Sequence, residues 1–132
     1  MNILIPMAGK GERFHTSGYT LPKPLIPIKN KPMIQNAIDS LGIKGNHIFI
    51  TQKDHEIKSK LLQNYPDSNT ISIDYITEGP ASTCLLAKEH INNDQPLLIA
   101  NCDQIMWWDS LAFSIFLELL IQKLPPKIVM LN

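Results

Sequence analysis

The chain has 132 residues, with 12 basic and 12 acidic side chains and a formal net charge of zero. This length suits a single domain with a sizeable core, and the balanced charge argues against a nucleic-acid or anionic-membrane binding protein. The two cysteines form no Cys-x-x-Cys pair, no leader peptide is recognisable, and no apolar run reaches the roughly 18 residues of a membrane span, so we expect a cytoplasmic protein.

The N-terminal segment predicts a buried strand followed by an anion-binding loop. Residues 2–7 contain the continuous apolar run Ile3-Leu4-Ile5. The next loop contains two glycines and three cations: Gly9, Gly11, Lys10, Arg13 and Lys23. Glycine lets the backbone approach a phosphate, and Lys and Arg add positive charge. Because open α/β sheets bind ligands at the carboxyl ends of their strands, the sequence predicts a polyphosphate site here.

Two common phosphate-binding motifs do not fit this loop. The dinucleotide fingerprint requires a third glycine at the position of Phe14, and the Gly-Lys-Ser/Thr sequence of a P-loop does not occur.

Helices and strands alternate in the rest of the chain. Pro32 begins a helix that Gly42 ends, and Asp54 caps a second helix that runs to residue 65. We expect further helices over residues 80–91 and 111–121, and strands over residues 47–51, 71–76, 97–100 and 128–131. This alternation is typical of an α/β domain with a parallel sheet and right-handed crossovers.

Two later connections carry further candidate site residues. Glu78 and Gly79 lie in the turn between the third strand and the third helix, where small residues would let a flat base lie against the backbone. Asp103 follows the fourth strand, and a carboxylate at that end of a strand is well placed to bind Mg²⁺. The simpler alternatives stay open: Asp103 as a turn residue or helix cap, residues 78–79 as a plain connection, and Lys23 as a solvated residue.

The N-terminal motifs resemble those of the sugar-1-phosphate nucleotidyltransferases, also called sugar-nucleotide pyrophosphorylases. That family begins with a strand, a Gly-x-Gly-x-Arg loop and a Pro-Lys-Pro segment. Here the corresponding residues are Gly9-Lys10-Gly11-Glu12-Arg13 and Pro22-Lys23-Pro24. The resemblance implies a Rossmann-like, three-layer α/β/α fold with a mostly parallel sheet, of the nucleotide-diphospho-sugar transferase type.

The resemblance also implies an activity and a role for each residue. A nucleoside monophosphate would pass from a nucleoside triphosphate to a sugar 1-phosphate, or a similar phosphomonoester, with release of pyrophosphate. The backbone of residues 8–11, which includes Ala8, would hold the triphosphate, and Arg13 would stabilise the pyrophosphate. Lys23 would neutralise the α-phosphate or the attacking phosphate, and Asp103 would bind the catalytic Mg²⁺. The turn at Glu78-Gly79 would contact the base. Synthesis of cell-surface polysaccharide precursors is the usual setting of such enzymes.

The resemblance covers residues 1–110, which we interpret as the nucleotide-binding core of a single domain spanning residues 1–132. Residues 111–132 differ from the continuation found in the family, which implies a truncated enzyme. Residues 111–121 are apolar nearly all round and predict a buried helix or an interface. Self-association through this segment is one way to cover it. The alternative is a catalytically incompetent nucleotide-binding remnant or an interaction module.

Overall fold

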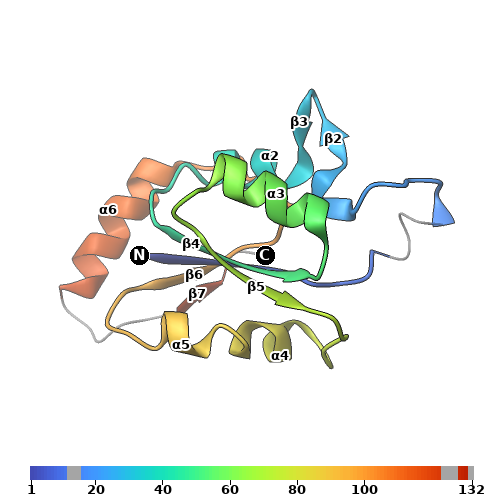
Figure 1. The fold of residues 1–132 in the computed structure, drawn as a ribbon. Helices are drawn as coiled ribbons and strands as arrows, with labels where there is room; N and C mark the ends of the chain where they lie inside the picture. Colours follow the sequence, from blue (N-terminus) through green and yellow to red (C-terminus); the bar gives the residue numbers. More distant parts are fainter. Residues whose placement is uncertain (12–15, 123–127, 131–132) are drawn as a thin grey trace.

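The computed structural model describes residues 1–11, 16–122 and 128–130 (Figure 1). Five strands in this part of the chain form a parallel sheet in the order β5-β4-β1-β6-β7. The strands are β1 (Asn2–Met7), β4 (Asn46–Gln52), β5 (Asn69–Ile73), β6 (Leu97–Ile99) and β7 (Ile128–Met130). The expected parallel α/β sheet is therefore confirmed, with the N-terminal strand at its centre.

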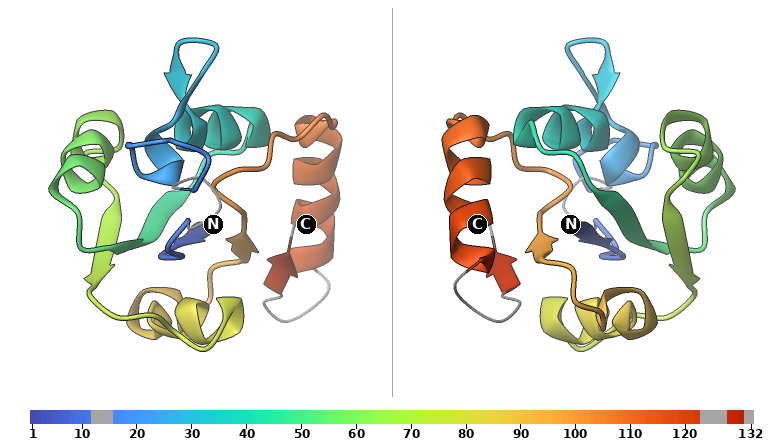
Figure 2. Two further views of the ribbon diagram at one scale, coloured as in Figure 1. Left: turned by 90° about the vertical axis from the view of Figure 1, so that its right-hand side faces the viewer. Right: turned by 90° about the vertical axis from the view of Figure 1, so that its left-hand side faces the viewer.

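Helices cover both faces of the sheet, as Figures 1 and 2 show. The helices α2 (Met33–Leu41) and α3 (His55–Asn64) lie on one face, and α4 (Pro80–Leu85) and α5 (Lys88–Ile91) lie on the other. Because β1 is buried on both faces, its alternate residues enter different cores. Ile3 and Ile5 pack in the core beneath α2 and α3, whereas Leu4 packs in the core on the other side. The predicted three-layer α/β/α architecture is confirmed.

The ends of the first two long helices follow from local chemistry. Gly42 ends α2 with a φ of 61°, a left-handed conformation that glycine adopts without strain. The Asp54 carboxylate accepts a hydrogen bond from the Ile57 N–H at 2.9 Å and caps α3. Both features agree with the sequence prediction.

A short segment that the sequence did not predict leads into α2. A 3-10 helix, η1 (Lys23–Leu25), is followed by a two-stranded antiparallel hairpin of β2 (Pro27–Ile28) and β3 (Lys31–Pro32). The turn residues Lys29 and Asn30 both have positive φ, the conformation that tight hairpin turns require. Leu25 is buried, so η1 is packed against the core and holds Lys23 in place.

The third strand and third helix differ from the prediction. β5 ends at Ile73, which pairs with Gln52, the last residue of β4. Tyr75 and Ile76 therefore lie in a loop. The helix expected over residues 80–91 is two short helices, because the Ala87 N–H donates to Cys84 O, three residues back, and fully buried Ala87 packs on the sheet.

The last helix, α6 (Ser110–Ile121), has the expected extent and is capped by Asp109, whose carboxylate accepts from the Ala112 N–H at 2.9 Å. It lies at the end of the sheet that β7 forms (Figure 2). Of the two predicted alternatives, a buried helix or an interface, the structure does not show the buried helix: Leu117 is the buried residue of α6, and most of its large apolar side chains face solvent. Within the described residues, no helix is long and apolar enough to cross a bilayer.

Candidate active site

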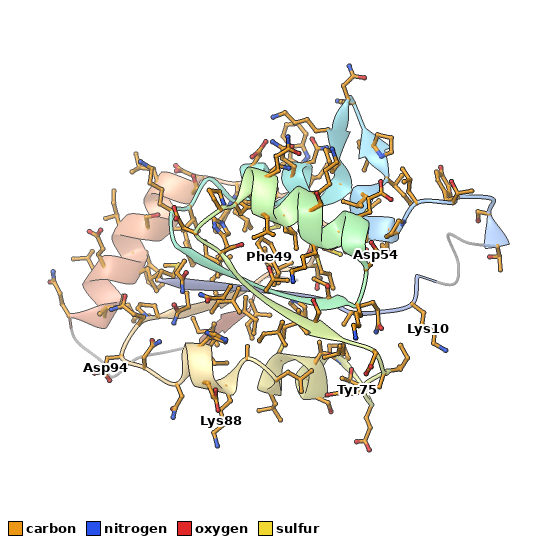
Figure 3. The ribbon with its side chains drawn as sticks, viewed as in Figure 1. Lys10, Phe49, Asp54, Tyr75, Lys88 and Asp94 are labelled. Atoms are coloured by element: carbon orange, nitrogen blue, oxygen red, sulfur yellow. The ribbon has the colours of Figure 1, made fainter. Side chains whose placement is uncertain are left out.

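A cleft of about 920 Å³ opens at the carboxyl ends of β1 and β6. Three segments that are distant in sequence line it: the loop after β1, the segment containing Lys23, and the connection after β6. The loop after β5 contributes Ile76. Figure 3 shows Lys10 and Tyr75, from two of these loops, at the same end of the sheet. This is the position where open parallel sheets bind ligands.

Lys23 and Asp103 meet across this cleft. The Lys23 Nζ donates to the Asp103 Oδ2, although the two residues are 80 positions apart in the sequence. Lys23 begins η1, whose next two residues are buried, and Asp103 follows buried Cys102 at the end of the β6 connection. Both residues are thus held by buried neighbours in the chain, and both side chains line the cleft. The structure brings together the cation and the carboxylate that the sequence singled out.

The glycine loop passes directly beside Lys23. Gly11 has a φ of 63°, and a Cβ on it would lie 3.4 Å from the Lys23 Cβ. Gly9 is exposed, and a Cβ added to it would meet no other atom within 4 Å, so a ligand can approach the backbone there. Ala8 is buried, and its carbonyl oxygen accepts a hydrogen bond from the Gln52 side chain. Arg13, the third predicted cation, lies outside the described residues.

The proposed base-contacting turn lies beside the cleft. Gly79 precedes α4, and its carbonyl oxygen accepts a hydrogen bond from Thr83 Oγ1 at 3.0 Å. Glu78 is exposed. Of the described residues in this loop, Ile76 lines the cleft, whereas Glu78 and Gly79 are not among its lining residues.

Sequence reasoning missed several cleft residues. Tyr19 and Asn101 line the cleft, and Gln52 supports two of its loops. Asn101 and Gln52 have a signal in common: each is a polar residue at or just after the carboxyl end of a buried strand, where parallel sheets place their binding groups.

Cys102 lies at the floor of the cleft but is not chemically activated. Burial, and to a smaller extent the charge of Asp103, raise the pKa of its thiol to about 11, although the Lys23 ammonium partly opposes this rise. The thiol is therefore protonated at neutral pH and does not supply a nucleophile.

The donor set of the cleft is compatible with Mg²⁺ that is held jointly with phosphate. Asp103 is the carboxylate among the described lining residues, and no group of three or more His, Cys, Asp or Glu side chains in the described chain could hold a metal. Mg²⁺ keeps several waters and commonly uses one or two carboxylates plus substrate phosphates, so a single carboxylate beside a phosphate site fits this ion.

Residues 3–112 match the family model of the MobA-like NTP transferase domain. The chain belongs to this family. The match covers the glycine loop, Lys23, Asp103 and all the strands as far as β6.

Curated proteins related to this NTP transferase domain are mannose-1-phosphate guanyltransferases. That of Hypocrea jecorina is 34% identical over 112 residues, and that of Yarrowia lipolytica is 31% identical over 112 residues. Each alignment covers 80% of this chain and 31% of the relative. The chain thus spans about a third of the length of these curated relatives.

A solved structure shares the fold. The nucleoside-diphosphate-sugar pyrophosphorylase from Vibrio cholerae superimposes with a TM-score of 0.67 at 19% sequence identity, over 85% of this chain and 52% of that one. The predicted nucleotide-diphospho-sugar transferase fold is confirmed, as is the resemblance to the sugar nucleotidyltransferases.

Proposed function

We propose that this NTP transferase domain binds a nucleoside triphosphate in the cleft and transfers its nucleoside monophosphate to a sugar 1-phosphate or a similar phosphomonoester. The observation that carries the proposal is the meeting of Lys23 and Asp103 beside the glycine loop in one cleft. A cation, a carboxylate and accessible backbone N–H groups are the parts that a polyphosphate site requires.

The proposed reaction is an in-line substitution at phosphorus. A phosphate oxygen of the sugar 1-phosphate forms a bond to the α-phosphorus, the bond from that phosphorus to the bridging oxygen breaks, and pyrophosphate leaves with the electron pair. The attacking phosphate is already an anion at neutral pH, so no general base is needed. Positioning and charge neutralisation then account for the rate.

The residues of this chain have distinct proposed roles. The backbone from Ala8 to Gly11 binds the triphosphate, and Lys23 neutralises the α-phosphate or the attacking phosphate. Arg13 stabilises the charge that develops on pyrophosphate. The loop over residues 76–79, with Glu78 and Gly79, lies against the base. These roles are supported by the Gly11–Lys23 proximity and by the place of Ile76 in the cleft wall.

Asp103 is the proposed ligand of Mg²⁺. Bound there, the ion would supply positive charge to the phosphate oxygens of the nucleotide. Since Lys23 holds the Asp103 carboxylate in this structure, we propose that the incoming phosphates attract Lys23 and leave Asp103 available. The two free thiols, Cys84 and Cys102, suit the reducing cytoplasm, where we place the reaction.

Pyrophosphate release tests the proposal directly. The chain is incubated with Mg²⁺ and each of the four common nucleoside triphosphates, with and without a panel of sugar 1-phosphates. The names of the curated relatives make GTP with mannose 1-phosphate the first pair to test. Release that requires both substrates supports the proposal. Nucleotide binding by calorimetry without release favours a nucleotide-binding module instead, and no binding at all contradicts both.

We also propose that the chain self-associates through α6. Six large apolar side chains on and just before this helix are 41–93% exposed: Trp107, Leu111, Ile115, Phe116, Leu119 and Ile121. At about 150–200 Å² for each fully exposed side chain, they expose on the order of 600 Å², close to the roughly 800 Å² that each partner contributes to a standard interface. A second copy presents the same area, which a twofold contact would cover.

Light scattering coupled to gel filtration tests this second proposal. The unmodified chain is expected to form a dimer, and Leu119→Glu is expected to be monomeric. Leu85→Glu is the matched control, since Leu85 is 69% exposed on α4, away from this helix, and should leave the dimer intact. A monomer at all concentrations of the unmodified chain would contradict the proposal.

A further inference from the structure

Gln52 connects two loops of the cleft through its side chain. It is the last residue of β4, and its amide nitrogen Nε2 donates hydrogen bonds to the carbonyl oxygens of Ala8 and Tyr75, the latter at 3.1 Å. Ala8 comes one residue after β1 ends, and Tyr75 comes two residues after β5 ends. The two bonds therefore begin where the backbone pairing of β4 with its two neighbours stops.

The geometry matches the chemistry of a glutamine amide. The amide group has two N–H donors, and here it meets two carbonyl acceptors. Glutamate would offer no donor, methionine offers none, and asparagine is one methylene shorter and cannot span the same two oxygens. The bond to Ala8 is partly buried and the bond to Tyr75 is exposed, so water competes mainly for the second.

The two connected loops have different positions in the cleft. The Ala8 loop continues into Gly9 and Gly11, and the Tyr75 loop continues into Ile76, all of which line the cleft. The ion pair of Lys23 and Asp103 spans the cleft toward β6, and Gln52 bridges toward β5. One side chain therefore bridges the loop after β1 and the loop after β5.

We propose that Gln52 is a positioning residue for the nucleotide: it holds the loop after β1 and the loop after β5 at the spacing that a nucleoside triphosphate spans. This inference rests on the proposed function, in which the phosphates lie on the first loop and the base lies against the second. A ligand that touches both loops then depends on Gln52. A ligand that touches the phosphate loop alone does not.

Two ligands of similar charge distinguish these cases. The binding of GTP and of inorganic tripolyphosphate is measured by calorimetry on the unmodified chain and on Gln52→Met, which keeps the side-chain length and the charge. Gln63→Met is the matched control, because Gln63 is exposed on α3, one residue before the end of that helix. Thermal unfolding of each variant establishes that it is folded.

Gln52→Met is expected to bind GTP about tenfold more weakly, the loss of up to two hydrogen bonds, while its affinity for tripolyphosphate changes less than about twofold. Gln63→Met should leave both affinities unchanged. If Gln52→Met does not fold, Gln52→Asn replaces it, with the same expected ratio. Equal weakening of both ligands, or no weakening of GTP, would overturn the positioning role while leaving the proposed function intact. A failure of the unmodified chain to bind GTP, ATP, CTP or UTP would overturn both.

Discussion

The substitution Lys23→Met removes the ammonium group from the cleft and keeps the apolar part of the side chain. The Lys23 and Asp103 side chains are 26% and 39% exposed, so water screens their attraction substantially. Ion pairs this open to solvent contribute about 0.2–1 kcal/mol to stability. We therefore expect the free energy of unfolding to fall by less than about 1 kcal/mol, because the packing of η1 on the core through Leu25 is unaffected.

In the proposed reaction, the loss of rate should be much larger than the loss of stability. Loss of one charged contact to a reacting phosphate typically costs about 3–4 kcal/mol in the transition state, and each 1.36 kcal/mol is a factor of ten. The value of kcat/KM for pyrophosphate release should therefore fall by about 100- to 1000-fold. A large loss of transition-state stabilisation with a small loss of folding stability is what we expect of a residue that acts on the substrate.

Lys31→Met is the matched control for this experiment. Lys31 pairs with Asp39 at 2.8 Å, and these side chains are 53% and 48% exposed, so the same chemical change is made in a comparable ion pair outside the cleft. Urea unfolding should give a similarly small loss for both variants, whereas the rate should fall in Lys23→Met alone. A Lys23→Met enzyme within threefold of the unmodified rate, or one destabilised by more than about 2 kcal/mol, would refute the reasoning.

Three further predictions concern the fold. Phe49→Ala should lose about 3–5 kcal/mol of unfolding free energy, because Phe49 is fully buried and its ring centre lies 5.4 Å from that of Tyr65. Leu62→Ala, at a half-exposed site on α3, should lose far less, and similar losses for the two variants in urea titrations would contradict this prediction. Gly42→Ala should lower the free energy of unfolding by at least about 1 kcal/mol more than Gly18→Ala does. Both glycines have positive φ, but a Cβ on Gly42 would lie 2.6 Å from the Ser110 Oγ, whereas a Cβ on Gly18 would meet open space. Equal midpoints of thermal unfolding for the two variants would argue against the contact. Burial raises the pKa of Cys102 to about 11, and burial together with the charge of Asp39 raises the pKa of Tyr65 to about 12. The stability that their neutral forms contribute is therefore complete below about pH 9 and is lost as the pH rises through 11 and 12. The free energy of unfolding measured from about pH 7 to 11 should show this decline, with a smaller slope in Cys102→Ala.

The sequence predicted the centre of the fold well because local and global requirements agree there. The run Ile3-Leu4-Ile5 is apolar at successive positions, and a strand covered on both faces buries such a run completely. Gly42 and Asp54 mark helix ends through their own backbone and side-chain chemistry, and both are found in those roles. Asp103 lies at the cleft because parallel strands place their carboxyl ends at one edge of the sheet, whereas the position of Lys23 depends on η1, which the sequence did not predict.

The features that the sequence did not predict depend on neighbours that are remote in the chain. β5 ends where β4 ends, and nothing in the sequence of residues 71–76 indicates that end point. The exposure of α6 depends on which other segments cover the edge of the sheet. The sequence of the helix alone does not indicate those segments. Gln52 was missed because its two partners, Ala8 and Tyr75, lie on different loops, and a lone glutamine after a strand has no distinctive pattern.

The separation of 80 residues between Lys23 and Asp103 has a consequence for biosynthesis. The central strand β1 lies between β4 and β6. The wall of the cleft that contains Asp103 therefore forms only when β6 pairs with β1, whereas the segment with Lys23 is made much earlier. During synthesis from the N-terminus, β1, β4 and β5 are therefore made before the segment that carries Asp103. Under the proposed function, a nucleotide would stabilise the state in which β6 has paired with β1 and none of the earlier ones.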